Sequence, residues 1–122
     1  KGFYAKPTLF DGLKENMTIA QEEIFGPVLT TLNFSTFSEA MNIANDTKYG
    51  LASAVWTSDI DKAISASRKL RAGTVYVNNY EEDVDTTIPL GGYKKSGIGR
   101  DNGYHSLDNY LQIKSTWIKI KN

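Results

Sequence analysis

The stretch "LASAVWTSDIDKAISASRKLRAGTVYV", residues 51–77, decides the fold, because two short apolar runs in it flank one helical pattern. Residues 51–56 are nearly all apolar, which is typical of a strand covered on both faces, and residues 74–77 are rich in strand-forming side chains. In the segment between them acids come first and basic residues last, the order that a helix dipole favours. Strand, helix and strand joined this closely predict parallel pairing through a right-handed crossover.

The helix inside this stretch carries start and stop signals of its own. We expect it to begin at Ser58, whose hydroxyl can cap the first turn, and Gly73 stands where the residue after a helix C-terminus would be. Its apolar stripe is formed by Ile60, Ala63, Ile64 and Leu70.

The preceding residues repeat the same alternation of strand and helix. Residues 28–34 alternate with a period of two after a Gly-Pro pair, which predicts a strand. Thr36 and Glu39 have the spacing of a capping box. One helical face then carries Phe37, Ala40, Met41 and Ala44. Together the segments predict an α/β fold with a parallel βαβαβ layer.

Beyond this layer, residues 78–103 form a loop of turn formers and charges, which is longer than a routine connection. Its run "GIGRDNG", residues 97–103, has neither the spacing nor the context of a dinucleotide-binding loop, so we expect backbone turns with positive φ there. A helical turn is expected at residues 104–109. In residues 110–122 apolar and polar side chains alternate, with a change of phase at Ile118, which predicts one long strand with a bulge or two short strands. Lysines at 114, 119 and 121 indicate a terminal edge that can pair with another chain.

Composition excludes several classes of function. The 14 basic and 14 acidic side chains cancel, which argues against a nucleic-acid partner. Without cysteine these residues hold no cysteine nucleophile, and a single histidine, His105, makes a metal site improbable, so we expect none. No apolar run is long enough to span a membrane and no signal peptide is recognisable, so we expect no membrane partner and a cytoplasmic location.

Two acidic segments are candidate sites, each with a plain alternative. Glu22 and Glu23 can be first-turn helix acids after Thr18, or a carboxylate there can bind two sugar hydroxyls while Phe25 lies against a planar heterocycle, as in a nucleoside. The four acids at 81, 82, 83 and 85 are either a solvated loop tip or a negative mouth that attracts a cationic substrate.

Four ordered motifs carry a family resemblance. They are "EEIFGPV" at 22–28, "YGLASAVWTSD" at 49–59, "AGTVYVNNY" at 72–80 and "PLGGYKKSGIGRDNG" at 89–103. In this order they resemble the C-terminal quarter of NAD(P)-dependent aldehyde dehydrogenases, over nearly all of the chain. The wording of "GGYKKSG" and "LDNYLQIK" resembles the amino-aldehyde and betaine-aldehyde branches.

The resemblance implies that the parent enzyme oxidises an aldehyde to a carboxylic acid with NAD or NADP, through a cysteine thiohemiacetal. By it, Glu23 matches the glutamate that binds the nicotinamide ribose hydroxyls, and Phe25 matches the aromatic residue packed by the nicotinamide. Residues 80–90 match the loop that shapes the substrate entrance. The residues expected at that entrance are Tyr80, Glu81, Asp83 and Leu90, the last at a position where many relatives carry phenylalanine.

The resemblance also divides the chain. Residues 1–109 match the end of the catalytic domain, and residues 110–122 match a strand that joins subunits into a homo-oligomer. The family's catalytic residues precede the matched region, so this segment contains no catalytic residue of its own. Because the chain also begins at Lys1 without Met, we expect a piece of a longer protein, inactive alone. The alternatives are a stand-alone oligomerisation or nucleotide-facing module without catalysis, and a plain structural α/β domain.

Overall fold

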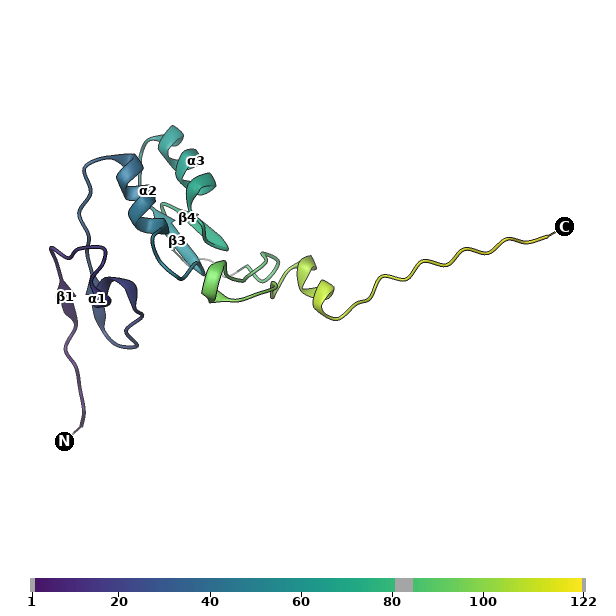
Figure 1. The fold of residues 1–122 in the computed structure, drawn as a ribbon, viewed down its shortest axis with the longest axis horizontal. Helices are drawn as coiled ribbons and strands as arrows, with labels where there is room; N and C mark the ends of the chain where they lie inside the picture. Colours follow the sequence, from purple (N-terminus) through teal and green to yellow (C-terminus); the bar gives the residue numbers. More distant parts are fainter. Residues whose placement is uncertain (1, 81–84, 122) are drawn as a thin grey trace.

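The computed structural model describes residues 2–80 and 85–121, which form an N-terminal part, a central part and an extended C-terminal tail (Figure 1). Its helices and strands are β1 (Thr8–Phe10), α1 (Thr18–Gln21), β2 (Val28–Thr30), α2 (Phe37–Asn45), β3 (Ala52–Val55), α3 (Ile60–Lys69), β4 (Thr74–Val77) and the 3-10 helices η1 (Lys94–Ser96) and η2 (Tyr104–Asn109). The α/β class is confirmed, and η2 occupies the segment expected to form a helical turn.

The central part is built on the pairing of β3 with β4. The two strands are parallel, with Ala52 opposite Thr74 and Val55 opposite Val77. The chain travels between them through α3, so the crossover predicted from residues 51–77 is confirmed. Helices α2 and α3 lie side by side against this pair of strands (Figure 1).

The prediction of a single βαβαβ layer is wrong, because the described strands form two separate sheets. β2 pairs in parallel with β1, Thr8 opposite Val28, and does not reach β3. A strand satisfies its backbone groups at whichever edge lies within reach, and residues 8–10 offer an edge to β2. The pairing continues past the strand ends, where the Thr8 N–H donates to Pro27 O at 2.9 Å and the Thr31 N–H to Phe10 O at 2.9 Å. The strand expected at 28–34 shortens to three residues.

Helix α2 begins as the sequence predicts. Thr36, in extended conformation at φ −131° and ψ 154°, accepts the N–H of Glu39 on its hydroxyl at 3.1 Å. The Glu39 carboxylate reaches back to the N–H of Ser35 at 2.7 Å, one residue earlier than in the usual reciprocal pattern. Two N–H groups at the start of the helix therefore have partners.

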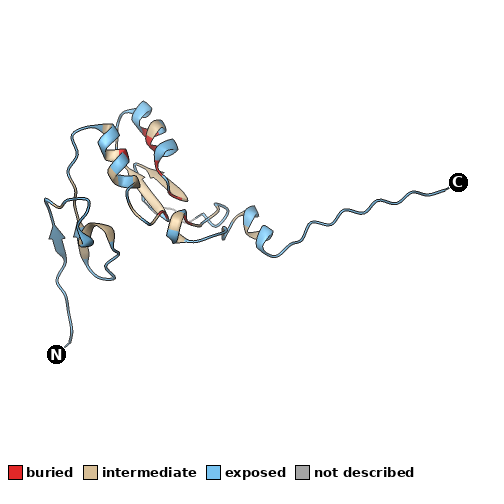
Figure 2. Cartoon of the chain, viewed as in Figure 1, coloured by how far each residue is buried: buried red, intermediate tan, exposed pale blue. Residues whose placement is uncertain are grey.

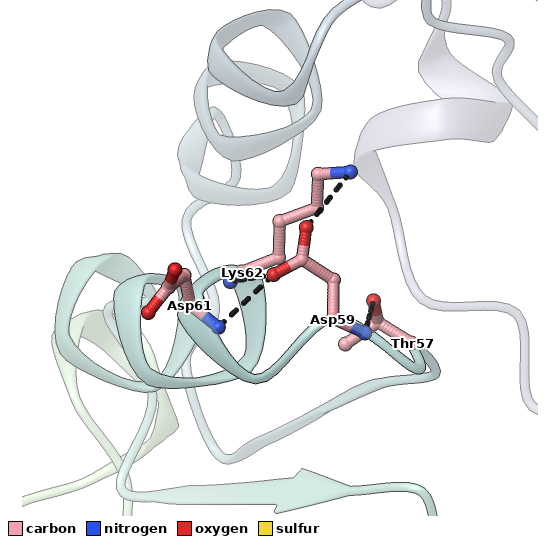
Figure 3. Close-up of polar contacts among 4 residues, drawn as sticks. All are labelled: Thr57, Asp59, Asp61 and Lys62. Atoms are coloured by element: carbon pink, nitrogen blue, oxygen red, sulfur yellow. Dashed lines mark hydrogen bonds and ion pairs between the residues drawn. The ribbon is translucent and has the colours of Figure 1, made fainter.

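Helix α3 begins one residue later than expected, with Asp59 in place of Ser58 as the cap (Figure 3). One Asp59 oxygen accepts the N–H groups of Asp61 at 3.0 Å and Lys62 at 3.1 Å, and the other lies 3.3 Å from the Lys62 ammonium. A carboxylate caps this helix better than the neighbouring hydroxyl, because its hydrogen bonds are stronger and its negative charge is stabilised by the positive end of the helix dipole.

The C-terminal end of α3 also differs from the prediction. The helix is capped by Leu70 in extended conformation, with ψ 125°, so Gly73 is not its terminating residue. Gly73 instead permits a close approach of two chain segments, because a Cβ on it would lie 1.5 Å from Gly91 O. The loop after β4 therefore returns against the start of that strand.

The core of the described residues is small. Met41, Ala66 and Leu70 form its buried cluster, between α2 and α3. The residues packed against this cluster are Phe37, Ala40, Val55 and Val75. Figure 2 shows buried residues only in the central part and exposed ones over most of both ends. Of the stripe expected on α3, Ala63 and Leu70 are buried, whereas Ile60 and Ile64 are 69% and 44% exposed. The buried face of α3 is thus centred on its alanines, which let α2 approach closely.

The loop and tail after β4 hold few regular contacts. Positive φ angles at Gly97, Gly99 and Gly103, of 127°, 84° and 58°, confirm the turns expected in "GIGRDNG". Residues 111–121 run extended and away from the rest, without a partner strand among residues 2–80 and 85–121 (Figure 1). The edge strand expected at residues 110–122 stays a prediction, because a strand there requires a partner strand from a second chain. In the described part of the chain, no helix is long and apolar enough to cross a membrane.

The Asp59 cap makes stability depend on pH in a defined direction. The hydrogen bond from the Lys62 N–H, followed by the Lys62 side chain, holds the pKa of Asp59 below its ordinary value of 3.8. A depressed pKa stabilises the folded state above the unfolded value, so this contribution is lost as the pH falls below 3.8 through the folded pKa.

We therefore expect Asp59→Ala to lower the melting temperature by a few degrees at neutral pH, and the difference from the unchanged protein to shrink in acid. Thermal unfolding followed by circular dichroism across the acidic range measures both. Asp59→Asn, which keeps an acceptor at the cap, should unfold above Asp59→Ala at neutral pH. Asp61→Asn is the matched control, since the Asp61 side chain makes no cap bond; an equal loss for Asp61→Asn would contradict the assignment.

Candidate functional site

An open hollow of about 410 Å³ lies where the N-terminal part meets the central part. Gln21, Glu22 and Glu23 line it at the end of α1. Ala44, Asn45, Thr47 and residues 49–53 line it from the end of α2 through the start of β3. Further contributions come from the end of α3, from Tyr80 after β4 and from Ser96 of η1. The site therefore draws on five segments of the sequence.

Glu22 is not a first-turn helix acid, so that interpretation is wrong. Helix α1 starts at Thr18 but ends at Gln21, and Glu22 follows as its C-terminal cap, extended at φ −112° and ψ 142°. A carboxylate there lies at the negative end of the helix dipole and gains nothing from it. Its partner is the Lys48 ammonium, 3.7 Å away, with both side chains substantially exposed. An exposed ion pair at this distance is weak.

Glu23 follows Glu22 directly and also lines the hollow. Its side chain is exposed and makes no hydrogen bond or ion pair within residues 2–80 and 85–121. A carboxylate has lone pairs for several donors, so Glu23 is free to accept two hydroxyl groups of a ligand. Of the two adjacent acids, Glu23 is thus the one available for binding.

Phe25 is not among the residues that line the hollow, and it is 93% exposed. The structure therefore brings Glu23 to the hollow and leaves Phe25 outside it, two residues further along non-helical backbone. An exposed aromatic ring can cover the face of a planar heterocycle. The residues present fit a nucleoside, with the carboxylate for its sugar hydroxyls and the ring for its base.

The expected entrance residues are distributed over two places. Tyr80 is half-exposed, lies 5.2 Å from the Tyr76 ring between centroids, and lines the hollow with Glu23. Leu90 lies in a second hollow, of about 420 Å³, and is bridged to Asp101 by two backbone hydrogen bonds of 2.7 Å. Glu81 and Asp83 lie outside the described residues. The structure thus separates Leu90 from the Glu23 hollow.

Asp85, the last of the four acids at 81, 82, 83 and 85, lies within the described residues. It accepts the hydroxyl of Thr87 at 2.6 Å and the N–H of Thr87 at 2.8 Å. These two hydrogen bonds, the hydroxyl first, lower the pKa of Asp85. The carboxylate therefore stays charged in mild acid and closes a small turn at this end of the loop.

Sequence reasoning missed the residues that hold the turn 45–50 in place. The Asn45 side chain accepts the N–H of Arg71 at 2.8 Å and donates to Lys69 O at 2.9 Å. The Lys94 ammonium donates to Asn45 O at 2.8 Å and Thr47 O at 3.0 Å. Lys94 itself has φ 55°, a left-handed conformation that is unusual for a lysine. Nothing in the spacing of Asn45 and Lys94 signals these contacts, because their partners are backbone groups of distant segments.

His105 takes no part in either hollow. Its Nδ1 lies 3.4 Å from a carboxylate oxygen of Asp108 on the surface of η2. Across residues 2–80 and 85–121 no three side chains of the metal-binding kinds gather in one cluster. The site chemistry that the structure offers is therefore that of a carboxylate, an aromatic ring and backbone.

Comparison with known proteins finds relatives that match nearly the whole chain. Residues 1–116 match the aldehyde dehydrogenase family. The solved structure of the indole-3-acetaldehyde dehydrogenase AldA of P. syringae, in complex with NAD+ and IAA, is 57% identical with a TM-score of 0.91, over 96% of this chain and 23% of that one. The aldehyde dehydrogenase KauB from Pseudomonas aeruginosa is 54% identical with a TM-score of 0.90, over the same shares.

A curated relative gives the same result. The NADP/NAD-dependent aldehyde dehydrogenase PuuC of Escherichia coli is 47% identical over 115 residues, which are 94% of this chain and 23% of the relative. This chain therefore spans about a quarter of the length of the proteins that it matches.

Proposed function

This chain belongs to the aldehyde dehydrogenase family, and on that premise we propose that it is the C-terminal segment of an enzyme that oxidises an aldehyde to a carboxylic acid with NAD+ or NADP+. The observation that carries the proposal is the position of Glu23, which lines the hollow with no partner for its carboxylate in the described part of the chain. When bound, the cofactor supplies the acceptor for the hydride that leaves the aldehyde carbon.

Glu23 and Phe25 have complementary roles in this proposal. The Glu23 carboxylate binds the two hydroxyls of the nicotinamide ribose, an interaction between a charged acceptor and neutral donors that is stronger than one between neutral groups. The exposed ring of Phe25 packs against the nicotinamide and limits its tilt. Together they orient the face of the heterocycle that receives the hydride.

The nucleophile lies elsewhere in the complete protein. The 122 residues contain no cysteine, and the cysteine that forms the thiohemiacetal has to come from outside them. We propose that the chain by itself is inactive and that the enzyme acts in the cytoplasm.

The substrate entrance is proposed at residues 80–90, with Tyr80 and Leu90 as apolar contacts and Glu81 and Asp83 as the charged part. An acidic mouth draws a cation towards it. The substrate that this charge favours is an aldehyde carrying an amino or quaternary ammonium group.

The tail is proposed to join subunits into a homo-oligomer. Its apolar side chains are exposed, from Leu111 at 65% to Ile113 at 102%, and its backbone is already extended. An extended segment with free backbone groups pairs readily with the edge of a sheet.

The cofactor role of Glu23 has a direct test in the complete enzyme. We expect Glu23→Gln to raise KM for the cofactor about tenfold or more, because a hydrogen bond to a charged group contributes about 1.5–3 kcal/mol. Steady-state absorbance of the reduced cofactor measures it, with the aldehyde saturating. Glu22→Gln is the neighbouring control and should change KM less than about twofold, since its ion pair is exposed. Equal effects of the two substitutions would refute the role of Glu23.

The acidic entrance predicts selectivity by charge. We expect the triple change Glu81→Gln, Glu82→Gln and Asp83→Asn to raise KM for an amino-aldehyde by about threefold to tenfold, and to leave an aliphatic aldehyde of equal length unaffected. Added salt should diminish the difference because it screens the attraction. The control removes the same charge outside residues 80–90, through Glu15→Gln, Asp61→Asn and Asp108→Asn. A rise in KM for both aldehydes alike would rule out the electrostatic explanation.

The tail predicts an effect on assembly. Proline donates no backbone hydrogen bond, so Ser115→Pro or Thr116→Pro should remove a contact of the intersubunit ladder, depending on which N–H faces the partner. At least one of the two should sediment as a smaller species than the unchanged enzyme in velocity ultracentrifugation. Ser115→Ala and Thr116→Ala should sediment like the unchanged enzyme. If both proline variants keep the original assembly, the tail does not join the subunits.

A further inference from the structure

One hydrogen bond links the N-terminal part of the structure to the central part. Residues 8–31, with β1, α1 and β2, form the first unit, and residues 36–80, with α2, β3, α3 and β4, form the second. Among residues 2–80 and 85–121, the hydrogen bond that crosses between the units runs from Gln21 Nε2 to Asp46 O, at 2.8 Å. The hollow that Glu23 lines lies beside this contact.

Both hydrogens of the Gln21 side-chain amide take part in hydrogen bonds. The same Nε2 also donates to Glu15 O at 2.8 Å, so both of its hydrogens are used on carbonyl oxygens. Carbonyl oxygens only accept, which requires the amide nitrogen and not its oxygen to face them. Gln21 thereby ties three chain segments: the loop before α1, the last residue of α1, and the end of α2.

The acceptor of this hydrogen bond, Asp46 O, lies in a turn that other hydrogen bonds stabilise. Asp46 is the C-terminal cap of α2, and its N–H donates to Asn42 O at 2.9 Å. The residues on either side of it, Asn45 and Thr47, both have their carbonyls held by the Lys94 ammonium, at 2.8 and 3.0 Å. A donor bound to Asp46 O is therefore fixed relative to α2, α3 and β3.

The donor end fixes Glu23. Helix α1 ends at Gln21, and the N–H of Glu22 still donates to Thr18 O at 2.9 Å, so Gln21 and Glu22 are held as one piece. Glu23 follows directly, with no tertiary hydrogen bond of its own in the described segments. The ion pair of Glu22 with Lys48 is exposed and long, at 3.7 Å, and adds little. The place of the Glu23 carboxylate on the wall of the hollow thus depends mainly on Gln21.

We propose that Gln21 is a positioning residue for the cofactor: its bridge to Glu15 O and Asp46 O sets the distance between the Glu23 carboxylate and the central part of the fold. This rests on the proposed function, in which Glu23 binds the nicotinamide ribose. Gln21 touches no ligand in this scheme and acts only through Glu23. Removal of its donors leaves the carboxylate present but displaced, which weakens cofactor binding without altering the aldehyde site.

The test is a double-mutant cycle in the complete enzyme between Gln21 and Glu23. Gln21→Glu keeps the shape and removes both donors. It should raise KM for the cofactor about fivefold or more, since the net contribution of the hydrogen bond to Asp46 O alone corresponds to about that factor. KM for the aldehyde should stay within about twofold. When Glu23→Gln is already present, Gln21→Glu should have no further effect on cofactor KM, because the group that it positions is gone.

Rescue and control variants separate positioning from general stability. Gln21→Lys should restore cofactor KM to near its original value, because an ammonium can donate to two carbonyl oxygens, as Lys94 does nearby. Asn109→Ala is the control: it removes an amide donor to Arg100 O at 2.9 Å, and should lower the melting temperature without changing cofactor KM. If Gln21→Glu does not accumulate as soluble protein, Gln21→Met removes the donors without adding charge and takes its place in the cycle.

The outcomes distinguish the inference from its premise. If Glu23→Gln leaves cofactor KM unchanged, the proposed function and the role of Gln21 are both wrong. If Glu23→Gln raises it but Gln21→Glu does not, or if the two effects multiply independently, Glu23 binds the cofactor without help from Gln21 and only the further inference is overturned. Non-additive effects together with rescue by Gln21→Lys support it.

Discussion

The carbonyl oxygens left without helical partners at the C-terminal end of α2 organise the structure around the candidate site. A helix cannot satisfy its last carbonyls internally, and each needs a donor from elsewhere. Here Asn45 O receives the Lys94 ammonium from the loop after β4, and Asp46 O, at the helix cap, receives the Gln21 amide from α1. The same ammonium also binds Thr47 O in the turn after the helix. The unpaired carbonyls at the end of α2 thus bring together α1, α2 and the loop after β4. The hollow that Glu23 lines lies between these segments.

The size of the core is consistent with a segment of a larger protein. Its buried cluster consists of Met41, Ala66 and Leu70, and large apolar side chains remain exposed on the first sheet, on α3 and along the tail. Soluble proteins rarely leave so much apolar surface uncovered, because its burial is the main favourable contribution to folding. The match to about 23% of the length of each relative accounts for that surface, since the remaining three quarters of such a protein are available to cover it.

Elements governed by neighbouring residues could be predicted, and those governed by distant ones could not. The Thr36 cap, the helices α2 and α3, and the parallel crossover between β3 and β4 follow from spacing and propensity within short windows. The placement of β2 in a separate sheet with β1 could not be anticipated, because the choice between two available edges is made by the whole chain. Gly73 is a similar case. Its position in the sequence indicated a helix end, whereas the structure needs glycine there because the backbone of Gly91 lies too close for a side chain.

By itself the sequence determined the family, the α/β class and the identity of Glu23 as a candidate ligand, because those depend on residue type and on order along the chain. Only the tertiary structure showed that Glu22, which also lines the hollow, is paired with Lys48, while the Glu23 carboxylate has no partner among the described residues. It alone also revealed Gln21 and Lys94, whose acceptors are backbone carbonyls 25 and 49 residues away. Every residue presents the same carbonyl group, so no pattern of side chains marks which one will be bound.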